Sequence, residues 1–155
     1  MKLQHRKHLV VFLDIDGVLN HEKLLKNNGG IDALDPESLK LIEKLVEETG
    51  ANIVITSVWR LSHSLNWIQH MFKSLGFAYP ERLIGITMNL PGEPRGNEIK
   101  LWLRQVPVDG FVILDDDSDM PGVQDHLVKT SFKTGLTKKH TERAKNILIK
   151  QLEVS

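Results

Sequence analysis

Two aspartates one residue apart, Asp14 and Asp16, follow the apolar run Leu9–Leu13, and Gly17 comes next. An unbroken apolar run of this length, bounded by a turn residue, predicts a strand that is buried on both faces. Two carboxylates at the end of such a strand repel each other and resist the loss of water unless positive charge lies between them. A divalent cation would supply that charge, and a phosphate group that reacts beside it would give the two carboxylates a function.

A second acidic group, which begins with Asp115, Asp116 and Asp117, follows the apolar run 110–114. Carboxylates that meet at one place require a hard cation with oxygen ligands, which suits Mg²⁺. We take Asp115/Asp116 as the metal-binding register, with Asp116/Asp117 as the alternative. The predicted cofactor is therefore Mg²⁺, and its predicted ligands are Asp14, Asp16, Asp115 and Asp116.

Other uses of these acidic groups do not fit their spacing. An EF-hand loop needs a glycine at about its sixth position and an acid at about its twelfth. Counting from Asp14 places Leu25 at the twelfth position, and counting from Asp115 places Met120 at the sixth. Neither GxxxxGK[ST] nor GxGxxG occurs, so a glycine-rich phosphate loop is absent as well. The chain contains no Cys, which excludes disulfides and Cys-ligated zinc.

The same residue types could transfer a phosphoryl group. A carboxylate beside a bound cation can attack phosphorus, and a second carboxylate can protonate the leaving oxygen and later activate water. We assign the first role to Asp14 and the second to Asp16. The phosphoryl oxygens then need a hydroxyl donor and a fixed positive charge. Thr56 or Ser57 supplies the hydroxyl, with Ser57 preferred, and Arg95 supplies the charge from the start of a predicted helix.

Polar residues near these groups are candidates for binding the substrate. We predict that Thr56, Asn20 and Arg60 contact it, although a turn-stabilising role for Asn20 and a surface position for Arg60 are equally compatible with the sequence. Trp59 and Trp102 are interpreted as packing residues of the core or its rim rather than as platforms for nucleic-acid bases.

Strands and helices alternate along the chain, which predicts an α/β fold: a three-layer sandwich with a mostly parallel central sheet. Asp35 as N-cap, Pro36 in the first turn and Gly50 at the end delimit one helix. Right-handed crossovers bring the carboxyl ends of the strands to one edge, where such sheets bind ligands. We expect strands at 9–13, 51–55, 82–87, 110–114 and 127–130, and further helices at 65–75, from 95 onward and at 138–152.

The length of 155 residues predicts one domain over 1–155, with residues 1–8 as a polar lead-in. Two segments, 20–34 and 77–94, are the insertions, and both are too short to form a large cap domain; residues 27–30 mark a turn in the first. Lys+Arg and Asp+Glu both number 20, so bulk charge does not direct the protein to nucleic acid or a membrane. Without a membrane-spanning run or a signal-peptide cleavage site, we expect a cytoplasmic protein.

The sequence DIDGVLN after a hydrophobic strand resembles the first motif of the haloacid dehalogenase (HAD) superfamily. Thr56-Ser57 is similar to its second motif, Arg95 to its third and Asp115-Asp116 to its fourth, in the same order. The stretches TSVWR, RGNEIKLWL and FVILDDDSD, with a later TGLT, resemble the small HAD domains associated with RNA-repair proteins. The third motif departs from the family, which usually has Lys there; Lys100 is the rival to Arg95.

The resemblance, which spans about residues 8–152, implies a Rossmann-like fold, a Mg²⁺ cofactor and hydrolysis of phosphomonoesters through an aspartyl phosphate. An open site without a large cap can admit a polynucleotide 3′-phosphate, and we take this as one candidate substrate. A small-molecule phosphatase and a non-catalytic module that binds phosphate or metal with the same fold are the alternatives. The oligomeric state is not indicated by the sequence.

Overall fold

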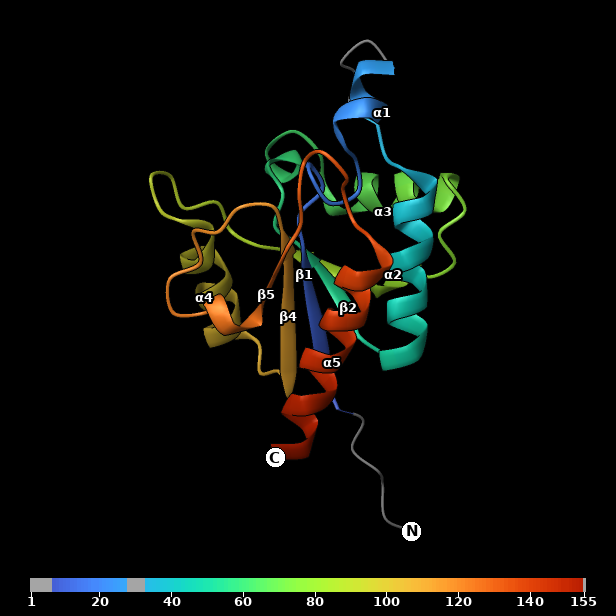
Figure 1. Ribbon diagram of the computed structural model, residues 1–155. Coiled ribbons are helices and arrows are strands. Elements are labelled where there is room, and N and C mark those ends of the chain that lie inside the picture. Colours follow the sequence, from blue (N-terminus) through green and yellow to red (C-terminus); the bar gives the residue numbers. More distant parts are fainter. Residues whose placement is uncertain (1–6, 28–32, 155) are drawn as a thin grey trace.

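The protein is built on one parallel sheet. The computed structural model describes residues 7–27 and 33–154. The strands follow the order β3-β2-β1-β4-β5, and every pair among them is parallel (Figure 1). The strands are β1 (Leu9–Leu13), β2 (Asn52–Ile55), β3 (Leu83–Ile86), β4 (Gly110–Asp115) and β5 (Leu127–Lys129). The predicted sheet is confirmed, with β1 at its centre.

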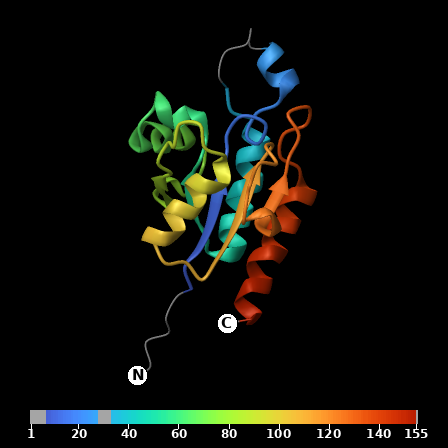
Figure 2. The ribbon, with the colours of Figure 1, turned by 90° about the vertical axis from the view of Figure 1, so that its left-hand side faces the viewer.

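Helices cover both faces of this sheet, so the predicted three-layer sandwich with a Rossmann-like arrangement is confirmed. Helices α2 and α5 lie side by side on one face and α4 lies on the other (Figures 1 and 2). The helices are α1 (Glu22–Asn27), α2 (Pro36–Thr49), α3 (Leu65–Ser74), α4 (Arg95–Gln105) and α5 (Lys138–Val154). Three short 3₁₀ helices join them: η1 (Val58–Leu61), η2 (Pro80–Arg82) and η3 (Gln124–His126).

The apolar run of β1 is buried on both faces, as its sequence predicts. Val11 and Leu13 belong to the larger core cluster, which also contains buried residues of α2, α3 and α5. Val10 and Phe12 point the other way, into a smaller cluster with Ile99 of α4. Successive side chains of a strand alternate between its two faces, so an uninterrupted apolar run serves both cores.

Helix α2 begins and ends where its capping residues predict. The Asp35 carboxylate accepts a hydrogen bond of 3.0 Å from the backbone N–H of Glu37. Gly50 adopts a left-handed conformation with φ of 72°, and its N–H donates to the Val46 carbonyl at 2.8 Å. These caps satisfy backbone groups that a helix end otherwise leaves unpaired.

The segment 20–34, the first of the two predicted insertions, contains the short helix α1, which rises above the carboxyl ends of the strands (Figure 1). The turn predicted at 27–30 lies mostly outside the described residues, as does most of the polar lead-in. The structure describes no cap domain, which agrees with the expectation from chain length. Among the described helices, none has the length and apolar character that crossing a membrane requires.

Candidate active site

The pairing register of the three central strands places the predicted site residues next to one another. Leu13, the last residue of β1, pairs with Ile55 of β2 and with Leu114 of β4. The next residues continue the ladder: the Asp14 N–H donates to the Leu114 carbonyl and the Thr56 N–H donates to the Leu13 carbonyl, both at 3.0 Å. The functional groups that follow β1, β2 and β4 therefore meet at one edge of the sheet.

Three carboxylates converge at this edge. Asp14, Asp115 and Asp116 each offer one oxygen, and these oxygens all lie within 4.8 Å of one another. Asp14 is 6% exposed and Asp115 only 1%, while Asp116 is half-buried. A compact set of oxygen donors with this much negative charge suits a hard divalent cation such as Mg²⁺. The donor set thus fits the cofactor that the family implies.

Burial raises the pKa of both inner carboxyl groups. For Asp115, loss of water and the nearby Asp14 carboxylate raise the pKa to about 8, against the opposing effect of Arg95. For Asp14, burial again raises the pKa, with Arg95 and the N–H of Ile15 acting in the opposite direction. The single guanidinium of Arg95 does not balance the negative charge of three ionised carboxylates. A bound cation would therefore be stabilised at this site.

Arg95 is the cation that faces these carboxylates. As the first residue of α4, it places Nη1 3.0 Å from Asp115 Oδ2 and 3.5 Å from Asp14 Oδ1. The same nitrogen donates to the Thr56 hydroxyl at 3.4 Å. Lys100, the rival for this role, extends toward Gly122. Its Nζ lies 3.3 Å from the position that a Cβ on Gly122 would occupy.

Arg60 and Glu98 form a buried ion pair behind Arg95. The Arg60 guanidinium bonds the Glu98 carboxylate and the backbone carbonyls of Thr56 and Ser57. Glu98 also lies 3.8 Å from Arg95 Nε, so one carboxylate contacts both arginines and helps to orient them. The Arg60 side chain is 4% exposed, and these contacts make it a framework residue; its predicted contact with substrate has no support from this geometry.

Asn20 braces the loop that carries the first two aspartates. Its Nδ2 donates to Asp16 Oδ1 at 2.8 Å, and its Oδ1 accepts from the Gly17 N–H at 2.9 Å. The side chain is completely buried and also donates to the Ala33 carbonyl. These bonds correspond to the turn-stabilising role considered from the sequence. The contact of Asn20 with substrate stays a prediction. Its side-chain amide is fully buried and so offers little surface to a substrate.

Asp16 lies outside the trio of converging carboxylates. Its Oδ1 accepts from Asn20 and, at 3.2 Å, from the indole Nε1 of Trp59. No hydrogen bond to its Oδ2 is found among the described residues, which leaves that oxygen available for chemistry. The geometry therefore agrees with an acid/base role for Asp16 more directly than with a side-chain ligand role, and both remain predictions.

The two hydroxyls that follow β2 have different partners. Ser57 caps η1 by accepting from the Trp59 N–H at 3.2 Å, whereas the Thr56 hydroxyl faces Arg95. Both side chains are completely buried. Thr56 therefore shares the arginine that contacts Asp14 and Asp115, and the choice between the two hydroxyls stays open to experiment.

Gly17 creates the space in which the acidic residues meet. Its φ of 81° lies in the left-handed region, and a Cβ built here would lie 2.3 Å from Asp116 Oδ2. Its carbonyl accepts a bond of 2.7 Å from the Thr130 hydroxyl, which ties this loop to the end of β5. Any larger residue at this position would displace the Asp116 carboxylate.

The register of the second acidic group follows from the turn after β4. Asp115 Oδ1 accepts from the Asp117 N–H, and Asp117 Oδ1 accepts from the Asp119 N–H, both at 2.9 Å. Asp117 and Asp119 are exposed, while Asp115 and Asp116 turn toward Asp14. The geometry thus favours the Asp115/Asp116 register over Asp116/Asp117.

Sequence reasoning missed two contributors to this site, Glu98 and the polar role of Trp59. Of the two positions expected for Trp59, the core and its rim, it occupies the core, but its indole nitrogen also donates to Asp16. The position of Glu98, three residues after Arg95 on one helix face, was the available signal for a paired side chain.

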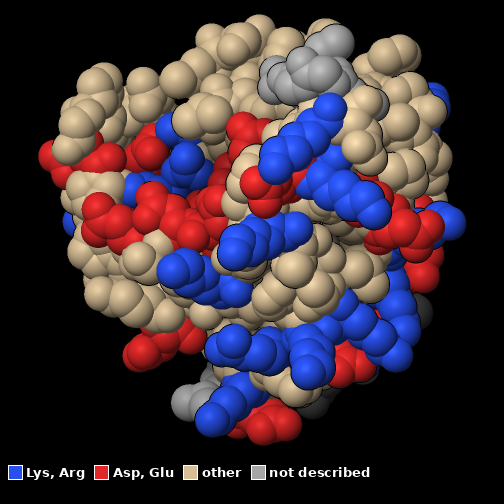
Figure 3. Space-filling model, turned by 45° about the horizontal axis from the view of Figure 1, so that its top comes forward, with Lys and Arg blue, Asp and Glu red and all other residues tan. Residues whose placement is uncertain are grey.

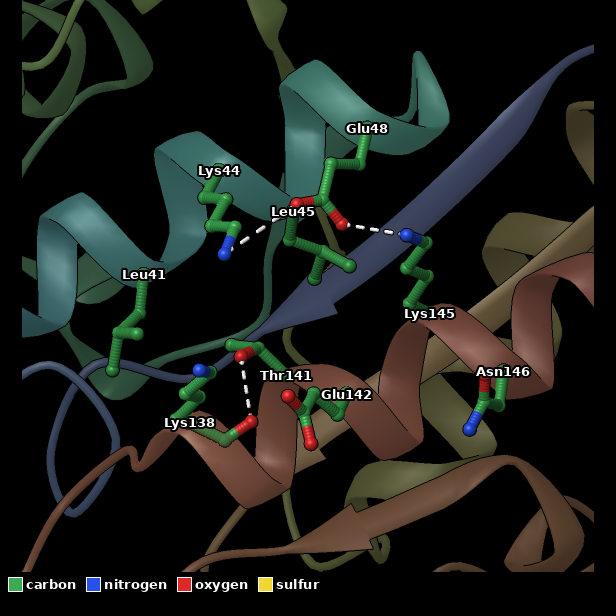
Figure 4. A pocket seen from close by; sticks show the side chains of 9 residues that line it. All are labelled: Leu41, Lys44, Leu45, Glu48, Lys138, Thr141, Glu142, Lys145 and Asn146. Atoms are coloured by element: carbon green, nitrogen blue, oxygen red, sulfur yellow. Dashed lines mark hydrogen bonds and ion pairs between the residues drawn. The ribbon is translucent and has the colours of Figure 1, made fainter.

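Charged side chains of both signs surround the site edge. Figure 3, which turns this edge toward the viewer, shows acidic side chains gathered beside separate basic groups. A hollow of about 400 Å³ lies between α2 and α5, lined by Lys44, Glu48 and Lys145 among others (Figure 4). None of the predicted catalytic residues lines this hollow, so the hollow is separate from the candidate site.

The sheet order β3-β2-β1-β4-β5 and the acidic cluster at its carboxyl end are those of a HAD-type α/β domain. More narrowly, the chain belongs to the family described as the HAD domain in Swiss Army Knife RNA repair proteins, whose model matches residues 10–141. The match includes every predicted site residue. A search of curated proteins finds no match to the chain.

Proposed function

We propose that this protein is a Mg²⁺-dependent phosphatase that hydrolyses phosphomonoesters through an aspartyl phosphate on Asp14. The observation that carries the proposal is the convergence of Asp14, Asp115 and Asp116 with Arg95, since three carboxylates and one guanidinium at a strand edge suit phosphate and a divalent cation together. Membership of a HAD family found in RNA repair proteins adds support for the phosphatase class.

Each residue has a role in a two-step reaction. A carboxylate oxygen of Asp14 attacks phosphorus, an O–P bond forms, and the bond from phosphorus to the leaving oxygen breaks. Asp16 gives its proton to that leaving oxygen. Asp16 then takes a proton from water, whose oxygen attacks phosphorus and breaks the bond to Asp14, releasing inorganic phosphate. Arg95 and the hydroxyl of Thr56 or Ser57 donate to the phosphoryl oxygens in both steps.

The cation has a limited, definable part in this proposal. Asp14, Asp115 and Asp116 would hold it, with Asp16 as the further predicted ligand, and bound Mg²⁺ would neutralise charge on the phosphoryl oxygens. Glu98 and Arg60 fix the guanidinium of Arg95 before the substrate arrives, so the donor does not have to be reoriented during the reaction.

The substrate that we propose is a nucleic-acid end that carries a 3′-phosphate. The family's occurrence in RNA repair proteins and the absence of a cap domain in the described residues both support a large, flexible substrate. Small phosphomonoesters can enter the same open edge, so they serve as a comparison in the test.

A phosphate-release assay tests the proposal. We expect Mg²⁺-dependent release from 3′-phosphorylated oligonucleotides, abolished by EDTA, with slower release from glycerol 2-phosphate. Asp14→Asn should lower turnover by roughly 10³-fold or more, because it removes the nucleophile while preserving its shape. Glu48→Gln, a carboxylate substitution between α2 and α5, is the matched control. Absence of Mg²⁺-dependent release from every ester, in a folded protein, would contradict the proposal and favour a non-catalytic binding module.

A further inference from the structure

A cluster of three aromatic rings lies beside Asp16. Trp59, whose indole nitrogen bonds Asp16, is within 5.8 Å of the His63 ring and 6.4 Å of the Trp67 ring, measured between centroids. His63 and Trp67 stack on each other with centroids 3.8 Å apart and ring planes 11° from parallel. Trp59 is buried, but Trp67 is 43% exposed. The cluster therefore runs from the site to the surface.

The backbone around this cluster holds the rings in place. The backbone N–H of Trp67 donates to the Oγ of Ser64, the N-cap of α3, at 3.1 Å. The backbone N–H of His63 donates to the Trp59 carbonyl at 2.9 Å. Figure 1 shows α3 at the same end of the sheet as the site. Trp67 thus presents part of a large aromatic ring to solvent, while the His63 ring stacks against it.

The position of the rings relative to Asp16 indicates what they could bind. In the proposed reaction Asp16 gives its proton to the leaving oxygen, so the leaving group must lie on the Asp16 side of the phosphorus. One buried ring, Trp59, separates Asp16 from the His63–Trp67 pair. Two other apolar side chains of η1, the short helix that contains Trp59, are also exposed: Val58 at 52% and Leu61 at 61%.

We infer that the stacked His63–Trp67 pair is a subsite for a nucleobase of the leaving nucleotide. An exposed indole, already supported on its inner side, offers a π-face to a base without requiring a particular sequence. Stacking also gives a way to hold a nucleic-acid end in a protein with equal numbers of acidic and basic residues, 20 of each, because it does not depend on neutralising phosphates. The inference rests on the proposed phosphatase function and adds the specificity-determining residue Trp67.

The first test compares two substrates through the ratio of their kcat/KM values. The substrates are a 3′-phosphorylated oligonucleotide and glycerol 2-phosphate, which has no base. Trp67→Ala should lower the ratio about 10-fold, in line with the loss of stacking to a base, and Trp67→Phe should restore most of it. Ile149→Ala, which shortens an exposed apolar side chain on α5, is the matched control and should leave the ratio unchanged.

The second test measures binding and does not require turnover. In the Asp14→Asn protein, a 3′-phosphorylated oligonucleotide should quench tryptophan fluorescence, and an otherwise identical one that lacks its terminal base should bind about 10-fold more weakly. Trp67→Phe should remove most of the quenching. Equal binding of the two oligonucleotides, or a substrate ratio unaffected by Trp67→Ala, would overturn the subsite and point to a protein partner for this surface. Failure of phosphate release with base-dependent binding intact would instead overturn the phosphatase proposal alone.

Discussion

Two regions of this protein bring acidic and basic side chains together, and they differ in burial. At the carboxyl edge of the sheet, Arg95 is 14% exposed and its partner Asp115 1%. Between α2 and α5, Lys145 is 37% and Glu48 33% exposed (Figure 4). Water screens the second pair, whereas the first pair is shielded from water, and there burial and the Asp14 carboxylate raise the pKa of Asp115 although Arg95 lowers it. Burial, rather than the number of charges, distinguishes the candidate site from an ordinary surface.

Among the substitutions in these two regions, removal of the buried Arg95 guanidinium should have the largest effect on turnover. Arg95→Ala leaves Asp14 and Asp115 without their guanidinium and removes a donor to phosphate. We expect turnover to fall by roughly 10²–10³-fold, measured as phosphate release under saturating Mg²⁺. Lys100→Ala, on the same helix, is the control and should have little effect. An equal loss in both variants would contradict the assignment of Arg95 to the third motif.

A methyl group at Gly17 should weaken the metal site without removing a ligand. The added Cβ would overlap the Asp116 carboxylate, and the left-handed backbone would be strained as well. For Gly17→Ala we expect Mg²⁺ to bind about 10-fold more weakly in a calorimetric titration (roughly 1–2 kcal/mol). Gly50→Ala shares the left-handed backbone but has nothing within 4 Å of its Cβ, so it controls for strain alone. The same affinity in both variants would show that Asp116 is not a ligand.

Asp115 should show opposite effects with and without metal. Above about pH 8, where the Asp115 carboxyl group of the metal-free protein is ionised, Asp115→Asn removes a buried charge that repels Asp14, so the metal-free variant should unfold at a higher temperature than the wild type, by about 2–4 °C for each kcal/mol gained. Mg²⁺ at 100 times its Kd should stabilise the wild-type protein by about 2.7 kcal/mol, and should have little effect on the variant. Thermal scans with Mg²⁺ and with EDTA measure both. Equal stabilisation of the two proteins by Mg²⁺ would remove Asp115 from the ligand set.

The exposed pair should give the smallest effect. Lys145→Ala should leave turnover unchanged and lower Tm only slightly. The hydrogen bond from Lys145 lowers the pKa of Glu48 from its ordinary value of 4.5. The contribution of the pair is therefore present above pH 4.5 and lost as the pH falls through the lower folded-state pKa. The Tm difference between variant and wild type should accordingly vanish in acid; a difference that persists there would indicate packing rather than charge.

The parts of the fold and site that follow from local patterns could be predicted from the sequence. The apolar runs before Asp14 and Asp115 define two neighbouring strands, and parallel pairing then brings their ends together. The caps Asp35 and Gly50 set the limits of α2 for equally local reasons. These features depend on residues a few positions apart.

Other features depend on contacts between distant segments and could not be derived in this way. The bond from Trp59 to Asp16 spans 43 positions, and the ion pair of Arg60 with Glu98 spans 38. Neither residue type nor spacing indicates such partners before the helices are placed on the sheet. For the same reason, the sequence left the choice between Thr56 and Ser57 open, and their different hydrogen bonds became apparent only in three dimensions.

The hydrogen bonds that anchor Asp14, the proposed nucleophile, at the end of the central strand have a consequence for hydrogen exchange. The amide of Asp14 donates to the Leu114 carbonyl of β4 and the amide of Thr56 donates to the Leu13 carbonyl of β1, so both continue the hydrogen bonding of the central strands at the carboxyl edge of the sheet. Such amides exchange with deuterium only through openings that disrupt the core itself. The amide of Asp14 should therefore stay protected for as long as the whole domain is folded.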